Sequence, residues 1–554
     1  MLALRGRLAN KLFRVAGTRC LSMPPNEPLT NIDGENRTKL LNAIKDVESQ
    51  TVEVPVICGG EKIFTGKVKY QVAPYNHATK IAKFHIADGE LIKETIKRAM
   101  AARKAWERTP FDERAAIFER FLDLLCGKYR YEFLATTMVG QGKTAYEADI
   151  DCVLELADFY RFDIYNGKRL LEGPELHQPQ GVKNSFIYRG LEGFVAAVAP
   201  FNFTAIGGNL SGTPVIMGNV VLWKPASTAI LSSYRVMEMF EEAGLPDGVM
   251  NFIPSSGPAF GESISTSPHL AAVNFTGSVG TFKTIWQNVA KNLDVYRTYP
   301  RLIGECGGKN YHFVHNSANV DIVVQSTIRA AYGYQGQKCS ACSRMYVPES
   351  KWPQIKEGLI EEHKKIKMGS PDDLENTFVT AVIDENSFDN IKSYIDYCKE
   401  SSNITILAGG KCDKSVGYYI EPTIVETKDP LDKMMKEEIF GPLVCIYVYP
   451  DNKYKETLEV VDTTNEFGLT GSIFGEDKEF IKEASDMLRD SAGNFYINDK
   501  CTGSIVQQQP FGGARMSGTN DKAGGLMYLL RWTSGMSIKE ALSNPGPWKY
   551  PHMK

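Results

Sequence analysis

The chain has 554 residues, more than one hydrophobic core can organise, so two or three domains are expected. Hydrophobic residues make up 43% of it and charged residues 23%, an ordinary balance for a globular protein. The formal net charge of −3 gives no electrostatic reason to expect nucleic acid or an anionic membrane as a partner. Eleven cysteines are scattered without framework spacing, which indicates reduced thiols in an intracellular compartment. No apolar run approaches the ~20 residues that a membrane-spanning helix needs.

The first 26 residues differ from the rest of the chain. They contain five basic residues and no acid, and the first acid is Glu27. Their leucines can share one face of a helix, which is the pattern of a mitochondrial transit peptide. We therefore expect residues 1–26 to be such a peptide and the protein to reside in the mitochondrial matrix. The alternative is a disordered basic tail.

The next elements are mostly helical. Residues 92–121 predict helix with a boundary at Pro110, and residues 144–160 predict a further helix. Residues 185–188 give a short strand signal after a segment that contains two prolines.

From residue 194 onward, strands and helices alternate. Strands are expected at 194–198, 220–223, 249–253 and 271–275, and helices at 207–217, 232–242, near Pro258 and at 281–289. The alternation resumes from 303 to 497. Repeated strand–helix units of this length predict α/β domains with parallel, doubly wound sheets, and we expect two of them.

A cysteine-containing stretch lies between a helix-like run (320–334) and a strand-like one (345–347). A thiol at such a junction can lie at the mouth of a cleft, so Cys339 is a candidate nucleophile. A lone cysteine is more often a small buried hydrophobe. The spacing to Cys342 also suggests a redox or zinc pair, but no second cysteine pair stands at a ligand spacing.

Glycines mark a possible anion site where the strand at 271–275 runs into the next helix. In Gly277-Ser278-Val279-Gly280-Thr281, backbone N–H groups and a helix N-terminus can meet a pyrophosphate, although a plain turn explains them equally well. Lys224 ends another strand of the same sheet and can bond a ribose hydroxyl, with a solvated surface lysine as the alternative. Residues 142–144 end like a phosphate loop, but position 137 is Thr where that loop needs Gly, so we discard it.

Two further polar residues follow apolar strands. Glu305 stands in a Gly-rich break and is a candidate general base, with a surface turn as the alternative. Asn202 lies between aromatic residues and can donate to an oxyanion, although a turn-forming role is favoured for it alone.

Taken together, these stretches resemble the aldehyde dehydrogenase superfamily. The matching motifs occur in the family's order over nearly everything after residue 50; they are Phe201-Asn202-Phe203, Trp223-Lys224-Pro225-Ala226, Phe275-Thr276-Gly277-Ser278, Glu305-Cys306-Gly307-Gly308-Lys309-Asn310, Gly336-Gln337-Lys338-Cys339 and Glu438-Ile439-Phe440-Gly441-Pro442. Residues 336–341, 502–506 and 510–515 are similar to the branch that oxidises L-glutamate γ-semialdehyde, the hydrolysed form of 1-pyrroline-5-carboxylate, to L-glutamate in proline degradation.

The resemblance implies a chemical role for each motif. Cys339 would attack the aldehyde, the Asn202 amide and the Cys339 N–H would hold the oxyanion, and Glu305 would activate water against the resulting thioester. The cofactor would be NAD, with NADP a weaker second, because Ser227 stands where the family often has a glutamate. No metal is implied. The implied cofactor contacts are Ala199, Lys224, Gly277, Ser278, Val279, Gly280, Thr281, Glu438 and Phe440.

At the substrate end, the resemblance implies a carboxylate anchor made of Ser340 and the backbone of Gly503 and Ser504. Phe203 and Phe511 would flank the aliphatic chain, and Glu155 is a candidate to face the ammonium group.

The resemblance also implies an aldehyde-dehydrogenase-like architecture. Residues 27–172 and 192–300 would form the NAD-binding domain and residues 301–525 the catalytic domain. A small β-flap of residues 173–191 and 526–554 would join subunits into a homodimer or larger homo-oligomer. A sister dehydrogenase for another aldehyde, a thiol hydrolase using Cys339 and Glu305, and a non-catalytic protein on the same fold remain as alternatives.

Overall fold

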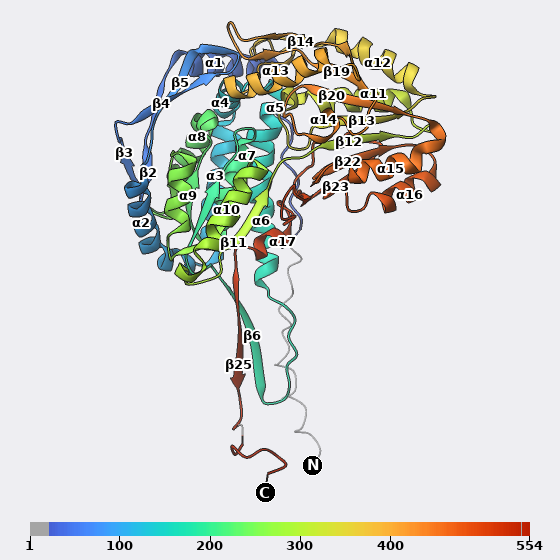
Figure 1. Ribbon diagram of the computed structural model, residues 1–554. Coiled ribbons are helices and arrows are strands. Elements are labelled where there is room, and N and C mark those ends of the chain that lie inside the picture. Colours follow the sequence, from blue (N-terminus) through green and yellow to red (C-terminus); the bar gives the residue numbers. More distant parts are fainter. Residues whose placement is uncertain (1–21, 545, 554) are drawn as a thin grey trace, which may run out of the picture.

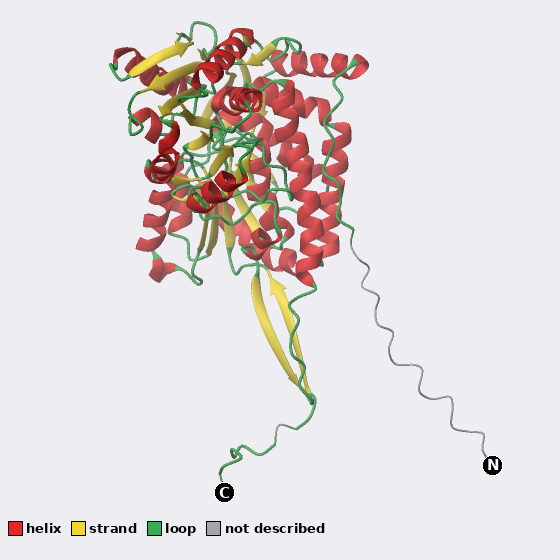
Figure 2. Ribbon diagram, turned by 90° about the vertical axis from the view of Figure 1, so that its right-hand side faces the viewer, coloured by secondary structure: helices red, strands yellow, loops and turns green. Residues whose placement is uncertain are grey.

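The computed structural model describes residues 22–544 and 546–553. Two α/β lobes lie side by side, and a narrow two-stranded ribbon projects from the first lobe (Figure 1). Figure 2 shows the same ribbon from the side, extending away from the body of the molecule. The expected transit peptide lies outside the described residues except for residues 22–26.

The first large sheet is parallel except at one edge, where β2 pairs in antiparallel fashion with both β9 and β3. Its strand order reverses beside β7, with β8 and β9 on one side and β10 and β11 on the other. Such a switch point leaves a crevice at the carboxyl ends of the strands, where open α/β sheets bind ligands. In spatial order the strands are β11 (Arg301–Glu305), β10 (Leu270–Thr276), β7 (Phe194–Val198), β8 (Val220–Lys224), β9 (Met250–Phe252), β2 (Val56–Cys58) and β3 (Glu61–Ile63).

Helices cover both faces of this sheet, which explains its continuously apolar strands. Alternate residues of β7 enter two different cores: Phe194 and Ala196 enter one, and Val195 and Ala197 the other. The first core is shared with α2 (Gly89–Arg108), α9 (Gly257–Ser265) and α10 (Val279–Lys291). The second is shared with α3 (Phe111–Asp123), α4 (Arg130–Gln141), α6 (Leu156–Leu171), α7 (Thr204–Ile216) and α8 (Ile230–Glu242).

The second large sheet is parallel apart from the edge pair β16–β19. The predicted pair of doubly wound α/β units is therefore confirmed. In spatial order the strands are β16 (Ile404–Ala408), β19 (Thr423–Thr427), β20 (Leu443–Tyr449), β13 (Cys342–Pro348), β12 (Asn310–Val314), β22 (Thr470–Phe474) and β23 (Asn494–Ile497).

The same alternation buries the second sheet. Met345 and Val347 of β13 pack toward α11 (Val320–Tyr332) and α12 (Trp352–Lys365), while Tyr346 packs toward the opposite face. That face is covered by α13 (Glu385–Glu400), α15 (Tyr454–Thr463) and α16 (Lys478–Met487). Shorter elements complete the lobe: β14 (Lys367–Met368), β15 (Thr377–Val379), β17 (Cys412–Asp413), β18 (Tyr419–Ile420), α14 (Lys433–Lys436), β21 (Phe467–Gly468) and β24 (Ala514–Arg515).

Sequence patterns did not predict the helix and strands at the N-terminal part of the first lobe. Residues 22–33 run without helix or strand and lead into α1 (Gly34–Ser49). A three-stranded sheet follows, in the order β1 (Val52–Val54), β5 (Asn76–His85) and β4 (Val68–Ala73).

The helix predicted at 144–160 is interrupted. It comprises α5 (Ala145–Ala148), a π-helical turn η2 (Asp149–Glu155) and the start of α6. A π-turn shifts the faces that side chains occupy, and such turns occur frequently at functional sites.

The ribbon is made of β6 (Val182–Arg189) and β25 (Ser534–Ala541), paired in antiparallel register from end to end. It lies within the two segments expected to form a flap. Residues 526–533, also assigned to the flap, pack into the body instead, where α17 (Leu526–Leu530) and the buried Trp532 join the second of these cores, beside α6. Among the described residues, no helix is long and apolar enough to cross a membrane.

Candidate active site

The two sheets bring the sequence-predicted residues together. Glu305 is the last residue of β11 and lies beside Thr276 at the carboxyl end of β10. Cys339 lies in the loop that leads into β13, a strand of the second sheet. Asn202 follows β7 and is only 3% exposed. The site therefore lies where the carboxyl ends of the strands in the first sheet face the loops of the second sheet.

The loop before Cys339 has an unusual backbone. Tyr334, Gln335 and Gly336 have successive φ angles of 51°, 55° and 67°, in the left-handed region. A Cβ on Gly336 would approach the Gly441 carbonyl oxygen to 2.2 Å, so only glycine fits there. The Gln335 amide holds the bend by donating to the carbonyl oxygens of Gly142 (2.8 Å) and Ala381 (2.9 Å). Backbone strain of this kind persists only where surrounding contacts over-determine it.

Amide side chains fix the backbone around Cys339. Asn310 Nδ2 donates to the Cys339 carbonyl oxygen at 2.7 Å and to that of Ala341 at 2.9 Å. Asn202 Nδ2 donates to the Gln337 carbonyl oxygen at 3.1 Å. A primary amide carries two N–H bonds, so Asn202 keeps a second donor for an oxygen that develops charge beside Cys339.

The Cys339 thiol is partly exposed and has a raised pKa. Burial raises this pKa most, and the carboxylates of Glu305, Glu438 and Glu155 raise it further, while the Ser340 N–H lowers it. The thiol is therefore protonated at rest, and the three carboxyl groups must lie close enough to influence it.

Glu305 also has a pKa well above its usual range, because burial disfavours its charged form. The Gly513 N–H donates to its Oε2 at 2.9 Å and opposes the shift. A carboxyl group with a raised pKa is suited to accept a proton near neutral pH.

Sequence reasoning missed a buried ion pair that positions the Asn202 loop. Lys143 Nζ lies 2.6 Å from Asp151 Oδ2, and both side chains are fully buried. Asp151 accepts from the N–H groups of Thr204 (3.1 Å) and Ala205 (2.9 Å) at the start of α7. Lys143 also lies 4.1 Å from the Phe203 ring centroid. Lys143 belongs to the stretch discarded as a phosphate loop, and Asp151 lies in the π-turn, which periodicity does not predict.

The expected cofactor residues lie around the switch point of the first sheet. Ser278 caps α10 by accepting from the Thr281 N–H at 3.3 Å, and a Cβ on Gly280 would meet open space. The Ala199 N–H donates to the Lys224 carbonyl oxygen at 3.0 Å and joins the ends of β7 and β8. Burial lowers the pKa of Lys224, whose ammonium group has no partner among the described residues. The helix N-terminus and this unpaired cation together fit an anionic, hydroxyl-rich ligand.

The second sheet contributes Glu438 and Phe440 to the same region. Glu438 Oε1 accepts from the Gly308 N–H at 2.8 Å, and burial raises its pKa to about 7. Phe440 has a φ of 59°, and its ring meets that of Phe201 edge to face at 5.8 Å.

The expected substrate end has a hydroxyl pair at its base. Ser340 Oγ lies 2.7 Å from Thr502 Oγ1, directly before Gly503 and Ser504. Gly503 has a φ of 83°, which orients the backbone of the next peptide.

Two other residues expected at the substrate end lie on different segments. The Phe511 N–H donates to the Ala523 carbonyl oxygen at 3.0 Å. Burial raises the pKa of Glu155 to about 8, and its carboxyl has no hydrogen-bond partner among the described residues.

Cys342 does not pair with Cys339. Its Sγ instead lies close to that of Cys501 and to a ring nitrogen of His312, with the three ligand atoms within 4.8 Å of one another. Each has a protein partner: Cys342 donates to the Arg344 carbonyl, Cys501 to the Ser340 carbonyl, and His312 Nε2 accepts from the Cys501 N–H. Their hydrogen bonds make this cluster a satisfied part of the core behind the Cys339 loop.

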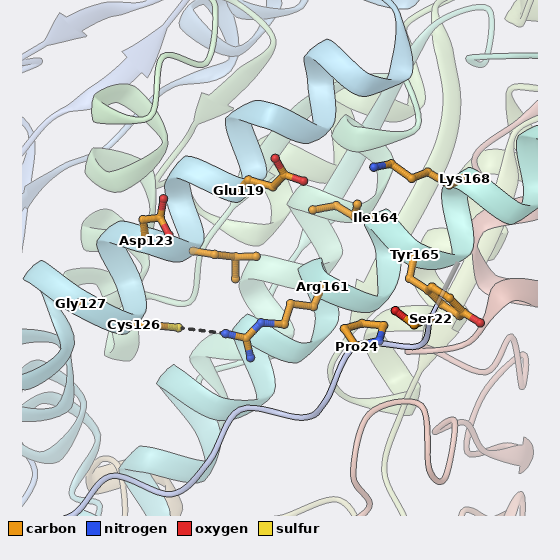
Figure 3. A pocket seen from close by; sticks show the side chains of 11 residues that line it. Ser22, Pro24, Glu119, Asp123, Cys126, Gly127, Arg161, Ile164, Tyr165 and Lys168 are labelled. Atoms are coloured by element: carbon orange, nitrogen blue, oxygen red, sulfur yellow. Dashed lines mark hydrogen bonds between the residues drawn. The ribbon is translucent and has the colours of Figure 1, made fainter. Parts of the chain in front are cut away.

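A separate hollow of about 620 Å³ lies away from these residues, against α3 and α6 (Figure 3). Its lining contains none of the residues predicted to be functional, so it is not part of this site. It is lined by Ser22, Pro24, Glu119, Leu122, Asp123, Cys126, Gly127, Arg161, Ile164, Tyr165 and Lys168.

Comparison with known proteins gives a consistent result. Residues 65–538 match the aldehyde dehydrogenase family. The whole chain is 54% identical to the Homo sapiens protein named delta-1-pyrroline-5-carboxylate dehydrogenase, mitochondrial, and covers 99% of it. Identity to the Dictyostelium discoideum protein of that name is 49%, over 96% of each chain.

Solved structures share the fold. The crystal structure of the Delta-pyrroline-5-carboxylate dehydrogenase from Mycobacterium tuberculosis bound with NAD matches with a TM-score of 0.92 and 40% identity, covering 96% of this chain and 99% of that one. A 1-pyrroline-5-carboxylate dehydrogenase from Thermus with bound NAD matches with a TM-score of 0.88 and 29% identity, over 94% of this chain and 100% of that one.

Proposed function

The chain belongs to the aldehyde dehydrogenase family, and from that premise we propose that it oxidises L-glutamate γ-semialdehyde to L-glutamate with NAD, the second step of proline degradation. The observation that carries the chemistry is the meeting of Cys339, Glu305 and Asn202 beside the switch point of the first sheet. The proposed substrate is supported by the names of the relatives.

The reaction divides into two steps at Cys339. In the first, the Cys339 thiol loses its proton to water and Sγ adds to the aldehyde carbon, while the free N–H of the Asn202 amide and the Cys339 N–H stabilise the oxyanion of the thiohemiacetal. NAD, when bound, would supply the acceptor for the hydride that leaves this carbon, and a thioester on Cys339 would remain. In the second, Glu305 takes a proton from water, which attacks the thioester and releases glutamate.

The residues present fit NAD. The α10 N-terminus, capped by Ser278 and open at Gly280, suits the pyrophosphate, and the unpaired Lys224 suits a ribose hydroxyl. Ser227 is exposed and carries no charge to repel a 2′-phosphate, so NADP should bind as a weaker second cofactor.

Glu438 should make NAD binding depend on pH. Its pKa is raised to about 7, so its carboxyl is neutral below that pH and charged above it. A charged carboxylate is the stronger acceptor for ribose hydroxyls, so KM for NAD should rise as pH falls through about 7. Glu438→Gln should raise KM for NAD by about two- to tenfold and remove the pH dependence. Steady-state kinetics from pH 6 to 8.5 measure both. If the wild-type KM for NAD does not change with pH, or if Glu438→Gln keeps the pH dependence, Glu438 does not have this role.

Ser340 supports the substrate assignment because it directly follows the nucleophile. Its hydroxyl and the N–H groups of Gly503 and Ser504 form a set of donors suited to a carboxylate. The distance between this anchor and Cys339 then sets the length of the aldehyde. A shorter semialdehyde reaches the anchor or the thiol well, but not both.

Ser340→Ala should therefore lower kcat/KM for glutamate semialdehyde by roughly 10- to 100-fold, mainly through KM. This is the loss expected when a hydrogen bond to a charged group, about 1.5–3 kcal/mol, is removed. For an uncharged five-carbon aldehyde, the kcat/KM of Ser340→Ala should fall by less than about threefold. Equal losses on both substrates would show that Ser340 supports the loop rather than the carboxylate, and would favour a sister aldehyde as the true substrate.

We assign a separate function to each lobe and to the ribbon. We propose that residues 27–172 and 192–300 bind NAD, that residues 301–525 carry the thiol chemistry, and that the β6–β25 ribbon joins subunits into a homodimer or larger homo-oligomer. The relatives' names support a mitochondrial location, and we propose the matrix, with a transit peptide at the N-terminus.

A further inference from the structure

The segment before α1, residues 22–33, is fixed to the first lobe by charged contacts; we call it the N-terminal arm. The Glu27 carboxylate, only 7% exposed, lies 2.8 Å from Arg130 and 2.5 Å from Arg161. Thr30 donates from its N–H and its hydroxyl to Asp149 at 2.7 and 2.6 Å. Figure 3 shows where the arm passes, with Pro24 and Ser22 beside Arg161 and Tyr165. The arm is therefore part of the folded body.

One residue of the arm contacts a segment near the other end of the chain. Asn26 Nδ2 donates to Asp158 Oδ2 at 2.7 Å and to the Val506 carbonyl oxygen at 3.1 Å, and Asn26 Oδ1 accepts from Gln508 Nε2 at 2.9 Å. Both donors and the acceptor of this amide are thus in use. Asp158 lies on α6, so Asn26 links a rigid helix to the segment at 506–508.

That segment connects two parts of the substrate site. It begins just after Gly503 and Ser504 and ends just before Phe511. Besides Asn26, three contacts hold this segment: Val506 is buried in the core around α6, the Gln507 side chain accepts from Asn166 at 2.9 Å, and the Ile505 carbonyl oxygen accepts from the Gln508 N–H at 3.0 Å. Gln507 has a φ of 69°, in the left-handed region. Displacing the Val506 peptide would move the two N–H groups of the anchor relative to Cys339.

We propose that Asn26 is a positioning residue for substrate specificity: it holds the 503–508 segment so that the Gly503 and Ser504 N–H groups meet the substrate carboxylate. This inference rests on the proposed substrate. It also implies that the mature chain must retain Asn26, so that a transit peptide would end before this residue and not after it.

The test compares full-length variants on two aldehydes. Asn26→Ala should raise KM for glutamate semialdehyde by about three- to tenfold, with kcat and KM for NAD unchanged. Asn26→Asp keeps the size of the side chain but loses both donors and faces Asp158 with a like charge, so its KM should rise at least as much. Both variants should oxidise the uncharged five-carbon aldehyde like the wild type.

Thr30→Val is the matched control, because it loosens the same arm at Asp149 without touching the 506–508 segment. It should leave the ratio of kcat/KM for the two aldehydes unchanged. A parallel loss on both aldehydes in Asn26→Ala, or the same selective loss in Thr30→Val, would overturn the proposal.

Hydrogen exchange separates this inference from the substrate assignment. Without substrate, amides of residues 501–509 should exchange faster in Asn26→Ala than in the wild type, and at the wild-type rate in Thr30→Val. If the wild-type enzyme does not prefer glutamate semialdehyde, the substrate assignment fails while exchange still reports on the arm. Unchanged exchange in Asn26→Ala would refute the positioning role whatever the substrate.

Discussion

Cys339→Ala should lower kcat for NADH production by at least about 10⁴-fold, because no other group can form the covalent adduct. NAD affinity should be unchanged, since the expected cofactor residues lie on other elements: Lys224 ends β8 and Ser278 caps α10. Aldehyde-dependent absorbance measures the first effect and isothermal calorimetry with NAD the second.

Cys342→Ala is the control for this experiment. Its thiol donates to the Arg344 carbonyl and faces Cys501 rather than the site, so the variant should keep activity near the wild-type level. Substantial NADH production by Cys339→Ala would disprove the nucleophile assignment. Equal inactivation by Cys342→Ala would reopen a paired-thiol mechanism.

Glu305→Gln should slow the release of glutamate by roughly 10²- to 10⁴-fold, the usual contribution of a general base. A neutral amide cannot take a proton from water, but hydride transfer does not require that proton. Rapid mixing should therefore show a burst of NADH close to one per site, followed by a slow phase.

The pH profile gives a second readout for Glu305. The carboxyl acts as a base only when deprotonated, and burial raises its pKa, so wild-type deacylation should speed up as pH rises through that raised value. Glu305→Gln should lose this rise. If the burst itself disappears, Glu305 acts earlier, by taking the proton from the Cys339 thiol.

Periodicity and spacing predicted the parts of the fold that depend on local pattern. The strand at 194–198 has the predicted bounds because both faces are buried and the run is short, and Pro110 separates α2 from α3 as expected. The three-stranded sheet β1–β5–β4 was missed because its longest strand, β5, begins with mostly polar residues and has Lys83 and His85 among the apolar residues of its second half. The π-turn at 149–155 was missed because it has no sequence period of its own.

The site was predictable where a motif marks it and not where distant residues meet. The resemblance named Cys339, Glu305 and Asn202, and the structure places all three at one crevice. Nothing in the sequence links Lys143 to Asp151, or Asn26 to Val506, because these contacts depend on how the arm, the π-turn and the second lobe pack. Side chains that hold the reactive ones in place have no signature at a fixed spacing.

The most direct test of the central claim is product analysis with purified protein, L-glutamate γ-semialdehyde and NAD. We expect one NADH and one glutamate for each semialdehyde consumed, no glutamate without NAD, and a kcat/KM above that for succinate semialdehyde and for uncharged aldehydes. Turnover that does not require NAD would indicate a thiol hydrolase, and a higher kcat/KM for another aldehyde would indicate a sister dehydrogenase; either result would contradict the proposed function.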